Sequence, residues 1–552
     1  MKWFFAYLGD NEDFDPVAHA VEDEIIFGAS IGHGEGEFSV AKIEVEAKSA
    51  SYISLGRRAA IAVEPTGGPV TLLFIGNITS APRAIEGEYV ELEILSRMED
   101  WEAAQAALID AIAETPGSFD PLFADVQALR DPAEVLSGVG GFVNWDRKTG
   151  APSLSMLDSG PRTLTFNRVD RDSVSLDVEA PPLKQVDIVV QASWSQDASV
   201  ESQVVWDHGP AFSVIAHEAL ADAWPPEGVD IGGGWAVKES VLQLNQPRFQ
   251  SLGEISGQYD SAIYSGDVPV YTAQIARVLL RNSRAQARSE IARVRVAADV
   301  QNLIEPATEE ISVSLQRLVG EGDTVEPWQP TSSYTLGDIV FYSGALYECL
   351  EDHDAGLYFD ESVWTLLPDF QGRIGTSFFE TDRGQQALDY AIERAIARLR
   401  YRARAVRVSF DVPLEDAIDI SLDDMATFSD PRLPGGTVTG KVISYNLFFD
   451  NGDAWATVEI GVSVGMGSTD EPVLPAFPGE APKLGPTEYP SKGKVSLLAA
   501  QQIAELRLAP DLQSLDVRVE IDAPAVPSTF ELTRDAVVNC GKIGLPQGIV
   551  LS

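Results

Sequence analysis

Short segments in which apolar and polar residues alternate recur along most of the sequence, and this pattern limits the possible folds more than any other feature. Residues 38–47 have the sequence FSVAKIEVEA, and residues 89–98 have the sequence YVELEILSRM. Turn residues such as the TGGP at 66–69 separate these segments. A two-residue period places every second side chain on one face of a strand. Closely spaced strands with Gly/Pro turns are typical of barrels and sandwiches, so we predict a mainly β fold with minor α structure.

A few segments predict helices instead. The Ala-rich stretch at 101–114, WEAAQAALIDAIAE, has a helical apolar period. At 274–300, four arginines are spaced 4, 3 and 4 residues apart, which would place them on one helical face before the strand-like end ARVRVAADV. Residues 387–413 follow the same plan of an arginine-rich helix and an alternating strand. We interpret the two arginine-rich segments as a weak internal repeat.

The arginines of these two predicted helices suggest a salt-bridged subunit interface, because the rest of the chain is acidic. They are Arg277, Arg281, Arg284, Arg288, Arg394 and Arg398. Ordinary ion pairing within the subunit is an equally open interpretation. Contact with nucleic acid is the least favoured of the three.

The length of 552 residues is too great for one hydrophobic core, and about 150 residues per domain would give three or four units. Strand-rich regions lie toward both ends, and a Pro-rich stretch follows the second one. The predicted regions are 1–95, a first β-barrel domain; 96–325, a mixed α/β domain with an arginine-rich helix; 326–370, an inserted aromatic β-module; 371–467, a second β-barrel domain; 468–492, a Pro-rich linker; and 493–552, a C-terminal β segment.

The charge excludes several classes of partner. Forty basic residues stand against 84 acidic residues, for a net charge of −44. This balance argues against a nucleic-acid-binding surface and against adsorption to anionic membranes. The acids form either an ordinary solvated surface or an acidic assembly surface or lumen that repels polyanions. Neither a signal peptide nor a run of 18 apolar residues is present, so we expect assembly in a cytoplasm and no membrane span.

The search for a catalytic motif gives no constellation in its proper context. The HEALAD segment at 217–222 lacks the second histidine of a zinc-binding HExxH motif. The GASIG at 28–32 matches GxSxG, but a glycine-rich turn follows it where a nucleophile elbow needs a helix. The two cysteines exclude a disulfide framework and a Cys-rich zinc site. We therefore expect no enzyme activity, no catalytic residues, no cofactor and no metal site.

An aromatic cluster interrupts the chain at 328–364, WQPTSSYTLGDIVFYSGALYECLEDHDAGLYFDESVW. It holds eight aromatics in 37 residues, whereas the whole chain is 9% aromatic. The spacing W…Y…GD.V.Y.G..Y…W resembles the small chitin-binding modules of carbohydrate-binding families 5 and 12. In that family, a short twisted sheet displays aromatic side chains that stack on sugar rings.

The resemblance implies carbohydrate contact by the conspicuous aromatics of the motif, which are Trp328, Tyr334, Tyr342, Tyr347 and Trp364. It also implies that Gly337 and Asp338 form the turn before a strand. A flat ring can cover the C–H face of a pyranose without hydrogen bonds. The alternative is that most of these aromatics form the core of a small fold, or that the acids of the second half bind through a cation.

The flanking regions resemble the tail-tip or baseplate hub of siphovirus-like phages and gene transfer agents. The resemblance is carried by WFFAYLGDNEDFDP, DEIIFGASIGHGEGEFSVAKIEVE, GSFDPLFADVQALRDPAEVLSGVGGFVNWDRKTG, ERAIARLRYRARAVRVSFDVP and DPRLPGGTVTGKVISYN, which together span roughly 3–150 and 375–465. It implies a virion structural protein, a homotrimer with two hub-type β-barrels per subunit. The ring would join the tail tube to tip or fibre proteins around a DNA-conducting channel, and the module would contact host-surface glycans.

Two other functions remain open. A secreted or virion-borne glycoside hydrolase could use the insert as a substrate anchor, which would require two carboxylates about 5–10 Å apart in a cleft. With 84 acids in the chain, acidic pairs in the sequence carry almost no information on this point. A non-phage adhesin or secretion-system component of the same ancestry is the third possibility.

Overall fold

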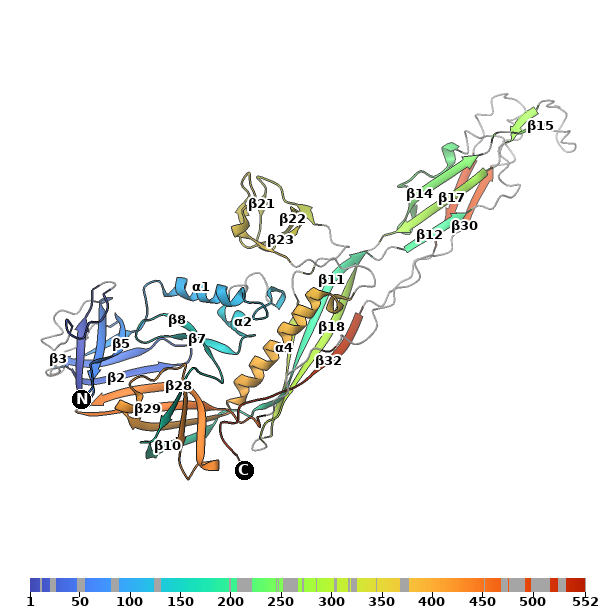
Figure 1. Ribbon diagram of the computed structural model, residues 1–552. Helices are drawn as coiled ribbons and strands as arrows, with labels where there is room; N and C mark the ends of the chain where they lie inside the picture. Colours follow the sequence, from blue (N-terminus) through green and yellow to red (C-terminus); the bar gives the residue numbers. More distant parts are fainter. Residues whose placement is uncertain are drawn as a thin grey trace.

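The structure is a computed structural model, and it is predominantly β with few helices (Figure 1). It describes residues 1–9, 12–19, 26–46, 55–80, 89–123, 131–197, 200–205, 221–244, 246, 248–251, 267–270, 273–283, 285–301, 305–315, 318, 325–343, 345–367, 377–450, 452–467, 475, 492–497, 517–524 and 533–551. The predicted Pro-rich linker at 468–492 lies outside the described residues except for Pro475 and Lys492.

The largest sheet has twelve strands, which come from both ends of the sequence. Its order is β1-β4-β5-β6-β3-β2-β28-β29-β26-β10, and β27 pairs with β28 and with β9. The strands are β1 Lys2–Tyr7, β2 Ile26–Gly34, β3 Val40–Glu46, β4 Arg58–Glu64, β5 Thr71–Ile78, β6 Tyr89–Leu95, β9 Thr163–Phe166, β10 Asp170–Val178, β26 Val406–Pro413, β27 Met425–Ser429, β28 Thr437–Asp450 and β29 Asp453–Val462.

The strands of the two predicted barrel domains meet where β2 pairs antiparallel with β28, from Gly28 opposite Asp450 to Gly34 opposite Ser444. Alternating side chains of both halves point into one shared core, as the period of the sequence predicts. Strands β9 and β10, from the predicted mixed domain, extend the same sheet. An Asn-Gly pair such as that at 451–452 is typical of a two-residue hairpin turn, and β28 and β29 on either side of it pair up to Asp450 opposite Asp453.

A second sheet of four strands carries the longest helix. Its order is β19-β11-β18-β32, with β11 Leu183–Asp197, β18 Ala285–Ala298, β19 Ala307–Ser314 and β32 Thr533–Ile543. Helix α4, Asp382–Ala403, packs against β11 and β18 through its apolar face. The Thr381 side chain caps this helix by accepting a 3.1 Å hydrogen bond from the Gly384 amide. The helix and the following β26 confirm the prediction for 387–413.

The predicted arginine-rich helix at 274–300 is wrong, and the internal repeat fails with it. This region forms strands β17, Ala273–Asn282, and β18. Of the four arginines, three lie on these strands and Arg284 lies outside the described residues. In β17 the side chains of Ala276, Val278 and Leu280 are buried in alternation. The alternation of apolar residues, and not the spacing of the arginines, therefore matches the observed structure. One face of β17 is buried, and its backbone pairs with β12 and β14.

A third unit continues away from the second sheet as a long arm (Figure 1). Its sheet has the order β12-β17-β14-β13, with β12 Val200–Val205, β13 Asp230–Gly232 and β14 Trp235–Leu244. The hairpin of β30, Lys492–Leu497, and β31, Val517–Asp522, packs on this unit, and the Trp235 indole N–H donates to the Pro524 carbonyl at 3.0 Å. Strands β15, Arg248–Ser251, and β16, Asp267–Val270, pair with each other. The C-terminal β segment thus completes two other units, the arm and the second sheet.

A smaller layer beside the large sheet has a core of its own, formed by α1 Trp101–Ala113, α2 Pro132–Leu136, β7 Gly141–Trp145 and β8 Pro152–Met156. The other short elements are η3 Pro121–Phe123, η6 Phe378–Glu380, α5 Leu414–Ala417 and η7 Pro434–Gly436. Helix α1 confirms the prediction for 101–114. The buried Arg147 ties this layer to the sheet, because its guanidinium donates to the Ile418 carbonyl at 2.5 Å and lies 5.1 Å from the ring centre of Tyr445. Among the described helices, none has both the length and the apolar character needed to cross a membrane.

One buried carboxylate joins the second sheet to the segment before α4. Glu290 on β18 is fully buried and accepts hydrogen bonds from Arg288 at 2.5 Å, from the Ser377 hydroxyl at 2.8 Å and from the Phe378 amide at 2.9 Å. The Arg288 guanidinium is buried as well and lies 5.2 Å from the ring centre of Trp194. A buried ion pair is stable only when both partners remain and their hydrogen bonds are satisfied.

We expect Glu290→Ala to destabilise the protein by about 3–5 kcal/mol, because it leaves a buried guanidinium without its carboxylate. The measurement is the urea midpoint of the first unfolding transition of the full chain. Glu93→Ala is the matched control, since Glu93 pairs with Lys42 at 3.8 Å on the surface and should shift the midpoint little. Equal shifts for the two variants would contradict the role assigned to Glu290.

Candidate functional site

The aromatic segment folds as a lobe of its own between β19 and α4 (Figure 1). One small sheet has the order β20-β22-β23-β25, with β20 Glu326–Pro327, β22 Ile339–Tyr342, β23 Ala345–Cys349 and β25 Trp364–Leu366. A second pair consists of β21 Ser333–Tyr334 and β24 His353–Asp354, and η5 spans Glu361–Val363. We call residues 326–367 the module.

The turn that precedes β22 has the geometry that the sequence predicts. Gly337 has a φ of +90°, which suits glycine because it has no Cβ. The Asp338 carboxylate accepts from the Thr335 amide at 2.8 Å and thus closes the turn. The backbone then exchanges hydrogen bonds with β23, from the Gly337 amide to the Cys349 carbonyl at 2.9 Å and from the Cys349 amide to the Asp338 carbonyl at 2.8 Å.

Phe359 lies at the centre of the aromatic cluster. Its ring stacks on Tyr342, with ring centres 4.1 Å apart and planes 8° apart, and on Trp364, with ring centres 5.5 Å apart. The rings of Trp328 and Tyr347 approach it edge-on, with ring centres 5.7 and 4.9 Å away. Contacts of this kind stabilise aromatic groups beyond simple burial. The structure thus brings together four of the five predicted aromatics around a residue that was not among the predicted binding residues, and the fifth, Tyr334, contacts Trp364.

The predicted sugar-contacting residues differ in exposure. Trp364 is only 5% exposed and forms the module's core with Val340 and Cys349. The other four are half-buried at the edge of this core: Trp328, Tyr334, Tyr342 and Tyr347. The Tyr334 hydroxyl is engaged by the backbone of Gln329, whose amide donates to it at 2.6 Å. Much of this cluster therefore stabilises the module. This agrees with the alternative interpretation of the sequence, in which most of these aromatics form the core of a small fold.

The most accessible aromatic of the module is Tyr358, which is 86% exposed, beside Leu357, which is 74% exposed. Tyr358 is one of the eight aromatics of the segment, but it holds no position in the family spacing and was not among the predicted sugar contacts. A signal was present in the run Leu357–Phe359, since three consecutive apolar residues cannot all point into one core. An exposed ring of this kind can present a flat apolar face to a ligand.

The acids of the module's second half are mostly engaged in its own hydrogen bonds. Asp352 accepts from the Leu336 amide at 2.7 Å, and Asp354 accepts from the Ser333 hydroxyl at 2.6 Å. Hydrogen bonds from the Ser362 hydroxyl and amide lower the pKa of Asp360. Across the described part of the chain, no group of three or more His, Cys, Asp or Glu side chains is placed to hold a metal ion.

Four of the six arginines predicted at a subunit interface have acidic partners within the chain, and Arg284 lies outside the described residues. Arg277 pairs with Glu239, and Arg288 pairs with Glu290. On α4, Arg394 lies 3.6 Å from a carboxylate oxygen of Glu134, and Arg398 lies 2.9 Å from one of Glu309. Arg281 also has an interaction partner. These pairs agree with the intrachain alternative, and the interface role stays a prediction.

One family model matches part of the chain, within the module. A family model for carbohydrate-binding module family 5/12 matches residues 327–358, which supports the resemblance seen in the sequence. No curated protein matches the chain.

Solved structures of phage tail proteins share a broad similarity with the chain. A tail protein from Neisseria meningitidis MC58 is 7% identical with a TM-score of 0.32, and the match covers 83% of this chain and 96% of that one. A 43 kDa tail protein of prophage MuSo2 from Shewanella oneidensis is 7% identical with a TM-score of 0.33, over 83% and 98% of the two chains. A Francisella PdpA–VgrG complex is 7% identical with a TM-score of 0.28, over 97% and 65%. These TM-scores are too low to assign a function to this chain.

We expect Gly337→Ala to destabilise the module by about 1–2 kcal/mol, because a Cβ is unfavourable at this positive φ. Gly356→Ala is the control, since Gly356 lies in the same module outside the positive-φ region, and a Cβ there would meet only the Tyr358 backbone at an ordinary contact distance of 3.9 Å. Hydrogen exchange of the module's amides in the full chain measures the effect. Exchange should be roughly 5–30 times faster in Gly337→Ala, and equal rates in the two variants would rule the explanation out.

Proposed function

We propose that this chain is a structural protein of a phage-type tail tip that carries a glycan-binding module and has no catalytic role. The observation that carries the glycan part is the family match at 327–358, on a segment that folds as a complete small β unit. The module is inserted between two elements of the second sheet's unit, β19 and α4, so it extends a scaffold without interrupting the scaffold's core.

The glycan would stack on the exposed surface of the aromatic cluster. Tyr358 offers the most open ring, and Tyr342 supports the neighbouring Phe359 from below by parallel stacking. Hydroxyl groups of a sugar need polar partners around such a ring, and the carboxylates at the module's surface supply acceptors. Because these groups are acidic, the module would favour neutral glycans over anionic ones.

The tail-tip part of the proposal rests on the sequence resemblance at roughly 3–150 and 375–465. The structure supports it by joining strands of both stretches in one sheet through β2 and β28. We propose a homotrimeric hub of a siphovirus-like phage or gene transfer agent, assembled in the host cytoplasm and located in the virion. Its partners would be tail-tube proteins and tip or fibre proteins, and a chain of net charge −44 would let DNA pass a central channel without adhering.

Replacing Tyr358 by Ala should weaken binding of the full chain to insoluble chitin by a factor of about ten or more, because roughly 1.5–3 kcal/mol of apolar contact is at stake for a large side chain. Leu357→Ala is the matched control, because Leu357 is a neighbouring exposed apolar residue without a flat ring. A pull-down with increasing amounts of chitin gives both affinities. Failure of the unmodified chain to bind chitin, cellulose or peptidoglycan would refute the glycan part.

Light scattering of the purified chain at moderate salt should give three times the mass of one chain. The trimer should persist as salt is raised if apolar contacts hold it, and dissociate if exposed ion pairs dominate. A single-chain mass over a wide concentration range would contradict a trimer that assembles by itself. The glycan test does not depend on this outcome.

A further inference from the structure

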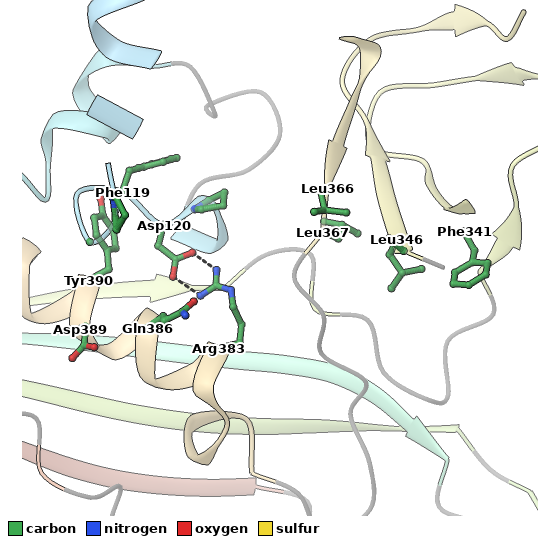
Figure 2. Close-up of a pocket in the computed structure, with 14 residues that line it drawn as sticks. Phe119, Asp120, Phe341, Leu346, Leu366, Leu367, Arg383, Gln386, Asp389 and Tyr390 are labelled. Carbon is green, nitrogen blue, oxygen red and sulfur yellow. Dashed lines mark hydrogen bonds and ion pairs between the residues drawn. The ribbon is translucent and has the colours of Figure 1, made fainter. Parts of the chain in front are cut away.

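A cavity of about 720 Å³ lies between the module and the body of the protein. Figure 2 shows side chains of the module on one side of it and side chains of α4 and of the loop before η3 on the other. Its volume falls within the range of about 300–1,000 Å³ that small-molecule sites occupy. Its lining includes none of the five aromatics predicted to contact sugar, so it is separate from the aromatic cluster.

The module's wall of the cavity is apolar. Phe341 and Leu346 lie opposite each other in the β22–β23 pair, and the Leu367 amide donates to the Leu346 carbonyl at 2.8 Å. These residues belong to the face of the small sheet opposite to that of Val340 and Tyr342, because neighbouring residues of a strand point to opposite faces. Phe341 is 44% exposed. A ring and aliphatic groups exposed to a cavity suit the C–H face of a sugar.

The opposite wall holds polar groups in fixed positions. Arg383 on α4 binds both carboxylate oxygens of Asp120, with 2.8 Å between Nη1 and Oδ2, and Asp120 also accepts from the Leu122 amide at 2.9 Å. The Asp120 side chain is only 5% exposed. Gln386 lies one turn after Arg383 on α4, is exposed and lines the same wall of the cavity (Figure 2). An ordered ion pair and a nearby amide are preorganised partners for hydroxyl groups.

The charge of the lining selects between kinds of ligand. Asp120 and Asp389 contribute two carboxylates, and Arg383 contributes one guanidinium that is already paired. An anionic ligand would meet an unbalanced negative charge and lose its hydration, which is unfavourable. A wholly apolar ligand would leave the polar groups of this wall without water or partners. The amphipathic character of a neutral sugar fits both walls.

We propose that this cavity is a second saccharide site, which binds a neutral pyranoside between Phe341 on the module and Gln386 on α4. The inference rests on the proposed glycan-binding function, and it deepens that function by adding a place where module and scaffold hold the same ligand. In this arrangement the scaffold contacts the glycan directly. If the aromatic cluster were the only site, the scaffold would not contact the glycan.

The test is isothermal titration calorimetry of the full chain with the tetramer of N-acetylglucosamine. Gln386→Ala and Phe341→Ser should each weaken binding about fivefold or more. Glu393→Ala is the matched control, because Glu393 lies on the same face of α4 two turns further on, is exposed and does not line the cavity. Alanine has a high helix propensity, so Gln386→Ala should leave α4 folded. It therefore tests the site even if Phe341→Ser destabilises the module.

Two results would overturn the inference in different ways. If Gln386→Ala and Phe341→Ser bind like the unmodified chain while Tyr358→Ala binds more weakly, the cavity site is refuted and the proposed function stands. If the unmodified chain binds no neutral oligosaccharide, both are refuted. A galacturonic acid trimer should bind at least tenfold more weakly than the neutral tetramer. The selectivity for neutral sugars would be refuted if the acidic trimer bound as tightly as the tetramer and Gln386→Ala abolished its binding.

Discussion

The antiparallel pairing of β2 with β28 is the contact on which the large sheet depends. It joins residues near 30 to residues near 447, so every strand on one side of the join comes from the first hundred residues. Because both halves bury alternating apolar side chains in one core, neither half has a complete core alone. Pairing over such a sequence distance costs loop-closure entropy, and the shared core makes the strands of both regions one folding unit.

Because the β2–β28 pairing completes the large sheet, much of the chain between these two strands forms other units. Both the arm and the module branch from the second sheet's unit: strands β12 to β17 of the arm lie between β11 and β18 in the chain, and the module lies between β19 and α4. The Glu290 carboxylate binds Ser377 and Phe378, which are the first described residues after the module. A buried, fully hydrogen-bonded carboxylate thus holds in place the segment that leads into α4.

The arrangement places two different surfaces of one small sheet against different surroundings. One face holds the aromatic cluster around Phe359, and the other presents Phe341 and Leu346 to the cavity. A strand's period of two makes this division unavoidable. A module of this size has little material for a core, so the same aromatics must stabilise it and leave a ring for a ligand, and the near-complete exposure of Tyr358 beside the buried Trp364 reflects that compromise.

Local sequence patterns are enough to predict the features that depend on near neighbours: the alternating strands, helix α4, the hairpin after Asp450, and the module with its Gly337 turn. Which distant partners meet depends on the tertiary structure. Strand β17 formed where the arginine spacing predicted a helix, because β12 and β14 supply hydrogen bonds on both sides. Likewise, the family spacing located the module correctly. Which ring is exposed, Tyr358 or Trp364, depends on how the side chains pack around Phe359, and local sequence patterns do not predict this packing.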